Sequence, residues 1–264
     1  MKHLIPFMKS EPLVNIVRLQ GAISNSSNGM DDVGLAGVLE KAFTKGKPAA
    51  VAMQINCPGG SPVQSSLIAA RIERLSKEKE VPVVAFVEDV AASGGYWLAC
   101  AADEIYIDQA SLVGSIGVIS AGFGLNDAID KIGVERRVYT AGKSKSMLDP
   151  FKKENAADVK RLKGWLEDLH EIFIGYVKSR RADKLADNPD LFTGEIFIGQ
   201  KAIDQGLVDG MDHLVPHMKA KFGDKVRFRK FGQRKSILQR FGANMATDAL
   251  GALEDRAAFA RYGL

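Results

Sequence analysis

Two short runs of apolar residues, each followed by a glycine-containing turn and a helical pattern, constrain the fold of this chain most. The first run is Ala49–Ile55, interrupted only by Gln54, and the second is Val81–Val87. A continuous apolar run of strand length is typical of a strand buried on both faces, as in a parallel sheet covered by helices. The repeated order of strand, glycine turn and helix therefore predicts an α/β fold with a mainly parallel sheet.

Other segments fit the same architecture. Leu13–Leu19 predicts the first strand, and Val33–Phe43 predicts an amphipathic helix after it. Between about Glu154 and Arg181, apolar residues recur at three- and four-residue steps, which predicts the longest helix. We expect further short strands at Glu104–Ile107, Val113–Ile119, Val134–Thr140 and Lys225–Phe231, and a loop at Glu88–Ala92.

The length and the distribution of residue types suggest one main domain followed by a tail. A chain of 264 residues suits one large domain or at most two small ones. We expect residues 1–230 to form a single main domain, large enough to contain an active site. Residues 231–264 are rich in Ala, Gly and Arg and only weakly amphipathic, so we expect a C-terminal tail or docking arm there.

The positive charge of the chain is concentrated near its C-terminal end. The formal net charge is +4, and Lys225–Arg240 contains seven Lys or Arg residues and no acidic residue. The simplest interpretation is solvated charge on an exposed strand edge. As a partner of this segment, an anionic membrane surface or a neighbouring subunit is favoured over nucleic acid, because no nucleic-acid motif accompanies the charge.

No targeting or membrane-spanning segment is evident in the sequence. No apolar run reaches the roughly 20 residues of a membrane span, and Met1–Ser10 lacks an apolar stretch of signal-peptide length. Cys57 and Cys100 lack CxxC spacing, so they predict neither a disulfide framework nor a zinc site. We therefore expect a cytoplasmic protein, with peripheral contact to the inner face of the membrane as a further option.

Ser93 is the first candidate for chemistry. It follows a buried strand, begins a predicted helix and precedes Gly94 and Gly95. At a helix N-terminus the free N–H groups and the helix dipole favour a developing negative charge, which suits a nucleophilic serine. Serine is also a common N-cap residue, so the local pattern alone leaves a purely structural role open.

The loop Asn56–Ser61 is the second candidate. It ends a neighbouring parallel strand, so we expect it at the same edge of the sheet as Ser93. Adjacent glycines let a backbone approach a substrate carbonyl closely. The N–H groups of Gly60 and Gly94 could together form an oxyanion hole, and an ordinary Pro-Gly turn is the alternative.

A serine nucleophile needs a general base, and the histidines are poorly placed for this role. His170 falls within the long helix, and His213 and His217 fall on a later, surface-like helix. Lys145, with Lys143 as its rival, follows a predicted strand and a glycine turn. A lysine withdrawn from water releases its proton more readily and can act as a base, although a solvated loop charge is the simpler interpretation of either lysine alone.

These segments together resemble one known family. Five blocks occur in order: Asn56–Gly60, Asp89–Asp103, Leu112–Ile119, Gly142–Lys145 and Gly206–Asp209. In this order they are similar to the signature of the signal peptide peptidase A family of Ser/Lys proteases. The resemblance covers about Leu13–Asp212 and implies a Clp protease/crotonase-like fold, in which stacked strand–strand–helix units bury a mainly parallel sheet.

The resemblance implies a role for each candidate residue. Ser93 corresponds to the nucleophile, and the spacing selects Lys145 rather than Lys143 as the general base. Ser115 corresponds to a serine whose hydroxyl orients the lysine amine. Many members of the family have an N-terminal membrane anchor or signal, which we do not expect here. Ser146 follows the lysine where the family often has Asp, and Cys57 rather than Ser precedes Pro58.

The implied activity is that of a serine endopeptidase acting through an acyl-enzyme. The amide of Gly94 and that of Gly60, or of Gly59, correspond to the oxyanion hole. No cofactor and no metal are implied. The implied substrates are signal-peptide remnants or other unfolded peptide segments, and the implied assembly is a homo-oligomeric ring, expected to be an octamer.

Three other interpretations compete with this one. A Clp-type protease would need a histidine base some tens of residues after the serine, and the first histidine after Ser93 is His170. A crotonase-like acyl-CoA hydratase or isomerase would use two amides to hold a thioester oxyanion, together with a positioned Glu or Asp. The third is a catalytically inactive or membrane-associated scaffold that keeps the fold.

Overall fold

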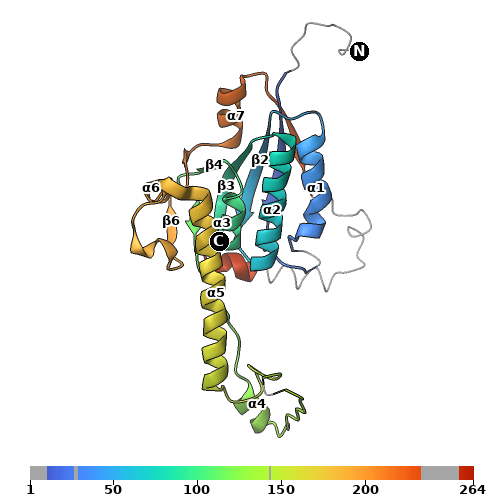
Figure 1. Ribbon diagram of the computed structural model, residues 1–264, viewed down its shortest axis with the longest axis vertical. Helices are drawn as coiled ribbons and strands as arrows, with labels where there is room; N and C mark the ends of the chain where they lie inside the picture. Colours follow the sequence, from blue (N-terminus) through green and yellow to red (C-terminus); the bar gives the residue numbers. More distant parts are fainter. Residues whose placement is uncertain (1–10, 27–28, 143, 233–255) are drawn as a thin grey trace. The chain divides into compact units, whose positions relative to one another are not determined.

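The computed structural model describes residues 11–26, 29–142, 144–232 and 256–264. In these residues an eight-stranded sheet is accompanied by helices (Figure 1). The strands are β1 (Leu13–Gln20), β2 (Ala50–Cys57), β3 (Val83–Ala92), β4 (Glu104–Ile107), β5 (Leu112–Gly114), β6 (Ile196–Ile198), β7 (Gly210–Met211) and β8 (Arg227–Phe231). The α-helices are α1 (Asp32–Thr44), α2 (Pro62–Lys79), α3 (Gly94–Ala99), α4 (Asn126–Lys131), α5 (Ala156–Arg181), α6 (Gln200–Asp204) and α7 (Leu214–Phe222).

The sheet is parallel at every described pairing except one. Its strand order is β6-β5-β3-β2-β1-β8, and β4 pairs with both β3 and β7. Only the β5–β6 pair is antiparallel. Parallel neighbours need a crossover connection, which α1 supplies between β1 and β2 and α2 supplies between β2 and β3. The predicted α/β fold with a mainly parallel sheet is confirmed.

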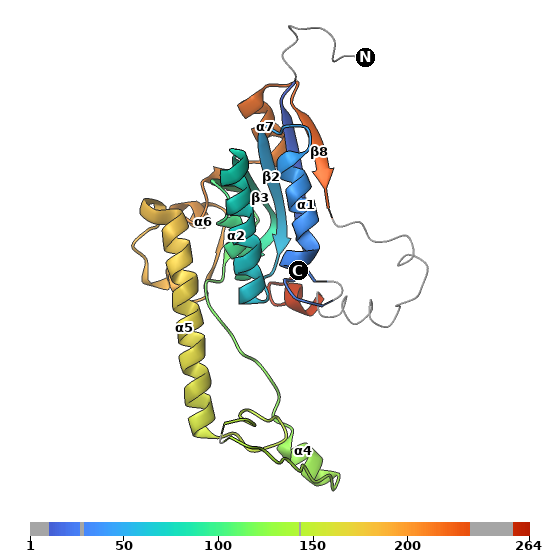
Figure 2. The same cartoon turned by 45° about the vertical axis from the view of Figure 1, so that its right-hand side comes forward.

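The central strands are largely buried on both faces, as their apolar runs predict. On one face, Val14, Ala52 and Phe86 form a core cluster with Met218 of α7 and Val226. Helices α1 and α2 lie side by side along the sheet in Figure 2. Their buried residues include Leu39 and Ile72.

Two strand predictions are wrong in their bounds. Glu88–Ala92, predicted as a loop, continues β3, because Val90, Ala91 and Ala92 pair in register with β5. The strand predicted at Val113–Ile119 ends already at Gly114. The extension of β3 matters for the candidate site, because it places Ser93 directly after a paired strand end.

The structure divides into two compact units, residues 1–116 with 176–264 and residues 117–175. The smaller unit contains α4 and most of α5. Within it, Arg136 pairs with Asp149 at 3.3 Å and lies over the ring of Phe151. The strand predicted at Val134–Thr140 is wrong, because these residues have no strand partner in the described chain.

The C-terminal part agrees with prediction where the structure describes it. The predicted strand Lys225–Phe231 corresponds to β8, an edge strand that pairs with β1 in parallel. The predicted boundary between residues 230 and 231 stays a prediction, because residues 233–255 lie outside the described part. Among the described residues, no helix combines the length and apolarity that crossing a membrane requires.

Candidate active site

Ser93 stands at the junction of β3 and α3 with an unusual backbone conformation. Its φ is 53° and its ψ is −122°, and its side chain makes no hydrogen bond that caps α3. The Ser93 N–H donates to the carbonyl oxygen of Gly114 on β5 at 2.8 Å. A non-glycine residue in this region of conformational space costs on the order of 1–3 kcal/mol and is typical of functional sites. The geometry therefore disfavours the simple N-cap role.

The chain can turn so sharply at Ser93 because the next two residues have no side chain. A Cβ atom at Gly94 would collide with the Ser65 hydroxyl, and one at Gly95 would collide with the Cys57 carbonyl. All six residues of α3 are buried. The Ser-Gly-Gly sequence thus lets α3 pack directly against β2 and α2, with the half-buried Ser93 at its start.

The Asn56–Ser61 loop lies against Ser93, as predicted. A Cβ atom at Gly59 would lie 2.8 Å from the Ser93 Cβ and 3.1 Å from the Gly94 nitrogen. Gly59 has a φ of 108° and Gly60 a φ of 144°, values that side chains rarely allow. The loop is held by Ile23, whose N–H donates to Gly59 and whose carbonyl accepts from Ser61, both at 2.8 Å.

The amides of Gly60 and Gly94 are near one another and available. A Cβ atom at Gly94 would lie 3.4 Å from the Gly60 nitrogen. Within the described residues, neither N–H donates to another backbone group. Gly94 is the first residue of α3, so its N–H has no partner inside the helix. Two neighbouring N–H groups beside a serine could serve as an oxyanion hole.

Ser115 lies near Ser93 because it directly follows β5, the strand that pairs with the end of β3. Its neighbour Gly114 pairs with Ala92 and accepts the hydrogen bond from the Ser93 N–H. Ser115 also has a positive φ, 50°, and its N–H donates to the carbonyl of Glu195 at 2.8 Å. Two serines in strained backbone conformations therefore occupy adjacent strand ends of one unit.

Lys145 lies in the smaller unit, and its role stays a prediction. It is exposed within that unit, and its N–H donates to Gly142 at 3.2 Å. Lys143 lies outside the described residues. Of the described histidines in the larger unit, His213 lies 2.9 Å from Asp108 and His217 lies 2.9 Å from Asp212, both with carboxylate partners of their own.

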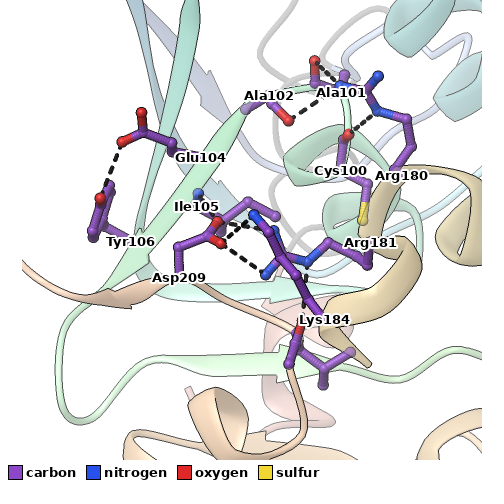
Figure 3. Close-up of polar contacts among 12 residues, drawn as sticks. Cys100, Ala101, Ala102, Glu104, Ile105, Tyr106, Arg180, Arg181, Lys184 and Asp209 are labelled. Atoms are coloured by element: carbon purple, nitrogen blue, oxygen red, sulfur yellow. Dashed lines mark hydrogen bonds and ion pairs between the residues drawn. The ribbon is translucent and has the colours of Figure 1, made fainter. Parts of the chain in front are cut away.

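The end of α3 opposite Ser93 is held by the last turns of α5. The Arg180 guanidinium donates to the carbonyls of Cys100 at 2.8 Å and Ala102 at 3.2 Å (Figure 3). Tyr176 stacks on Trp97, with ring centroids 4.9 Å apart. Carbonyls at a helix C-terminus have no partner within the helix, so Arg180 satisfies groups that would otherwise be unpaired.

A buried ion pair fixes the neighbouring turn. Arg181, only 3% exposed, donates to Asp209 at 2.8 Å and to the carbonyl of Gly206 at 3.0 Å (Figure 3). Asp209 also accepts from the Ile105 N–H at 2.8 Å and from Lys184 at 2.6 Å. Burial alone would raise the pKa of Asp209, but these hydrogen bonds hold that pKa below its usual value.

Sequence reasoning singled out Gly206–Asp209 as a block but assigned it no role, and it missed Arg180 and Arg181 entirely. Both arginines occur near the end of a long helix that is rich in charged residues. Nothing in that pattern separates a buried arginine from a solvated one. The described residues also contain no group of three or more His, Cys, Asp or Glu side chains placed to hold a metal ion.

Arg181→Met should lower the free energy of unfolding by about 1–3 kcal/mol, because it removes hydrogen bonds to the half-buried Asp209, which keeps Lys184 as a partner, and to the Gly206 carbonyl. Urea unfolding followed by circular dichroism measures this. Arg74→Met, which removes an exposed pair with Glu78, is the matched control and should change stability by less than about 1 kcal/mol. Equal effects of the two substitutions would contradict a structural role for the buried pair.

The same pair should make stability sensitive to acid. The pKa of Asp209 in the folded state lies below its usual value of 3.8, so its contribution is present above that pH. The contribution is lost as the pH falls through the folded-state pKa. Asp209→Asn should therefore be less stable than the wild type at neutral pH, with a difference that narrows in acid.

The amino-acid sequence is similar to proteins that carry different names. A Brucella melitensis protein named Na(+)/H(+) antiporter NhaA is 44% identical over 286 residues, which cover 100% of this chain and 39% of that protein. Probable protease SohB of Haemophilus influenzae is 30% identical over 207 residues, covering 77% of this chain and 57% of that protein. The chain thus spans well under two thirds of the length of these relatives.

Solved structures share the fold. A lysine-to-alanine mutant of the 1510-N membrane-bound stomatin-specific protease, in complex with a substrate peptide, matches with a TM-score of 0.54 and 14% identity. The match covers 91% of this chain and 100% of that chain. A serine-to-alanine mutant of the same protease matches with a TM-score of 0.51. The expected Clp protease/crotonase-like fold is confirmed.

The family follows from a match within the chain itself. The model described as peptidase family S49 matches residues 75–221, a stretch that includes Ser93, Gly94, Ser115 and Lys145. The serine and the glycines described above lie at the edge of the sheet where β2 and β3 end. Since the match spans more than half of the sequence, this chain belongs to peptidase family S49.

Proposed function

We propose that this chain is a serine endopeptidase in which Ser93 is the nucleophile and Lys145 the general base. The observation that carries the proposal is the strained, uncapped Ser93 beside the unbonded amides of Gly60 and Gly94. Membership of peptidase family S49 supports the same reaction class. The lysine rests on its match to the family motif, because Ser93 and Lys145 belong to different units.

The proposed mechanism is acyl transfer in two steps. Neutral Lys145 takes the Ser93 hydroxyl proton, and the Ser93 oxygen forms a bond to the substrate carbonyl carbon. The Gly60 and Gly94 N–H groups stabilise the resulting oxyanion. The C–N bond then breaks as Lys145 returns the proton to the leaving amine. Water, deprotonated in turn by Lys145, releases the acyl group and restores Ser93. Ser115 would orient the lysine amine.

Gly60→Ala should lower kcat for peptide cleavage by about 10²–10³-fold, because it removes an oxyanion donor from its position. A Cβ atom at this residue would collide with the Ile23 carbonyl, so the loop must move. Steady-state kinetics with a fluorogenic peptide measure the effect. Gly37→Ala, where an added Cβ atom meets nothing within 4 Å, is the matched control. Unchanged kcat in Gly60→Ala would contradict the proposed oxyanion hole.

The reactivity of Ser93 distinguishes the peptidase from the two competing functions. A crotonase-like hydratase could use the same two amides but has no need of a serine nucleophile. An inactive scaffold would need neither the amides nor the nucleophile. Covalent modification of Ser93 by a serine-directed fluorophosphonate, located by mass spectrometry, favours the peptidase, while absence of modification favours the other two.

We further propose that the chain assembles with copies of itself. In the smaller unit, large apolar side chains are exposed. They include Ile119, Phe123, Ile132, Tyr139 and Ile172, each at least 60% exposed. An apolar surface of this kind is typical of an interaction site, and a second copy of the chain fits a peptidase ring such as the expected octamer. Multi-angle light scattering should give a mass that is a multiple of 28.6 kDa, and a monomer would contradict this.

The substrates and location are proposed more broadly. Cys57 and Cys100 are buried and form no disulfide, which supports a reducing compartment such as the cytoplasm. Arg227, Arg229 and Lys230 of the edge strand β8 are exposed and could contact an anionic membrane surface at its inner face. Signal-peptide remnants or unfolded segments are the proposed substrates. We keep residues 1–230 as the peptidase domain and 231–264 as a docking arm.

A further inference from the structure

The residues 256–264 of the proposed docking arm return to the edge of the sheet that carries Ser93. In Figure 2 this segment lies beyond the ends of α1 and α2 that face the candidate site. Residues 256–260 are helical, and the turn after them is closed by a bond from the Tyr262 N–H to Phe259 at 2.9 Å. The segment therefore has a defined conformation of its own.

One face of this segment packs on the protein. Ala258, Phe259 and Tyr262 are half-buried, a spacing of one helical face, while Arg256 and Arg261 are exposed. The Tyr262 hydroxyl donates to the carbonyl of Pro58 at 3.3 Å. These two residues are 204 positions apart in the sequence, so the contact is a product of tertiary folding.

Pro58 is directly before the two glycines of the candidate oxyanion loop. Gly59 lies against Ser93, and the exposed Gly60 carries one of the two proposed oxyanion donors. A substrate carbonyl has to reach this loop from solvent. A segment anchored on Pro58 occupies space beside that approach.

The contact is weak enough to open. Among the described residues it comprises one long hydrogen bond and three half-buried side chains, and such sparse packing is typical of parts that open locally at low free-energy cost. We propose that residues 256–264, docked on Pro58, lie beside the open side of the Pro58–Gly60 loop and compete with substrate peptides for the approach to it. This inference rests on the proposed function, because it regulates the same site.

Competition between residues 256–264 and a peptide should change the apparent affinity for that peptide by a measurable factor. A segment that is docked nine-tenths of the time lowers apparent affinity for a competing peptide about tenfold. Phe259→Ala combined with Tyr262→Ala in the full chain removes the packed face and should free the approach to the loop. Arg261→Ala alters an exposed neighbour and is the matched control.

The first experiment measures docking and does not depend on catalysis. A fluorescein-labelled peptide with the sequence of residues 256–264 is titrated with each full-length protein, and anisotropy is recorded. We expect the double variant to bind about tenfold more tightly than the wild type or Arg261→Ala. Equal affinity for all three proteins, or no binding to any, overturns the proposal that this segment docks beside the loop.

The second experiment measures the consequence for the site. The rate of Ser93 modification by a fluorophosphonate should be about tenfold faster in the double variant than in the other two proteins. Equal modification rates overturn the regulatory role. If none of the three proteins is modified, the serine peptidase function is contradicted, and the anisotropy result still decides whether the segment docks.

Discussion

Ser93→Ala should lower peptide cleavage by about 10⁴-fold or more while leaving the fold intact. The side chain is half-buried and makes no capping hydrogen bond, so its removal costs the structure little. The nucleophile is the one group whose loss the other components cannot replace, since no acyl-enzyme forms without it. What remains is binding and oxyanion stabilisation alone.

The measurement combines kinetics with a stability control. Cleavage of a fluorogenic peptide is followed for Ser93→Ala and for Ser66→Ala, an exposed serine of α2. Thermal unfolding of both variants should resemble that of the wild type. Retention of full cleavage by Ser93→Ala would show that another residue is the nucleophile. Loss of cleavage in both variants would show a cause other than the serine hydroxyl.

Lys145→Ala is expected to have the second largest effect, a fall of about 10³-fold or more in kcat. Without a base, the Ser93 hydroxyl has to release its proton to water as it attacks. Lys143→Ala is the matched control, because this lysine is two residues away and carries the same charge. Activity lost in Lys143→Ala and kept in Lys145→Ala would reverse the assignment.

The pH dependence provides an independent test of the base. An amine takes a proton only in its neutral form, so the rate should rise from neutral towards alkaline pH. The rise should be absent from the residual activity of Lys145→Ala. A rate maximum near pH 6 in the wild type would indicate a histidine base instead.

The fold was largely predictable because a strand that is buried on both faces has a run of apolar residues in its sequence. Val81–Val87 is a continuous apolar run and Ala49–Ile55 is apolar except for Gln54, and they form the start of β3 and most of β2. The prediction failed at Glu88 and Asp89, whose polar side chains are typical of a loop. In the structure Glu88 accepts a hydrogen bond from Gln54 on the next strand, and Asp89 accepts one from Asn56, so both belong to a strand.

A second failure has a different cause. Val134–Thr140 contains β-branched and aromatic residues, which favour a strand. Within the described chain these residues pair with no neighbour and are mostly exposed. A strand needs a partner in space, and residue preference alone does not supply one.

The residues of the candidate site were predictable, but their geometry was not. Ser93, Gly94 and Gly60 can be selected from a strand followed by a glycine turn, and the family motif strengthens that selection. Whether Ser93 caps its helix or presents its hydroxyl depends on one pair of backbone angles. Those angles are maintained by the pairing of β3 with β5 and by close packing on Cys57.

The α/β class, the order of the central strands in the chain and the candidate residues for acyl transfer follow from local burial patterns and residue types, so they can be predicted from the sequence. Only the folded chain shows that Gly59 lies against Ser93, that Arg181 is buried against Asp209, and that Tyr262 contacts Pro58. These contacts join residues distant in the chain. Their formation depends on sheet register and close packing, which no single segment encodes.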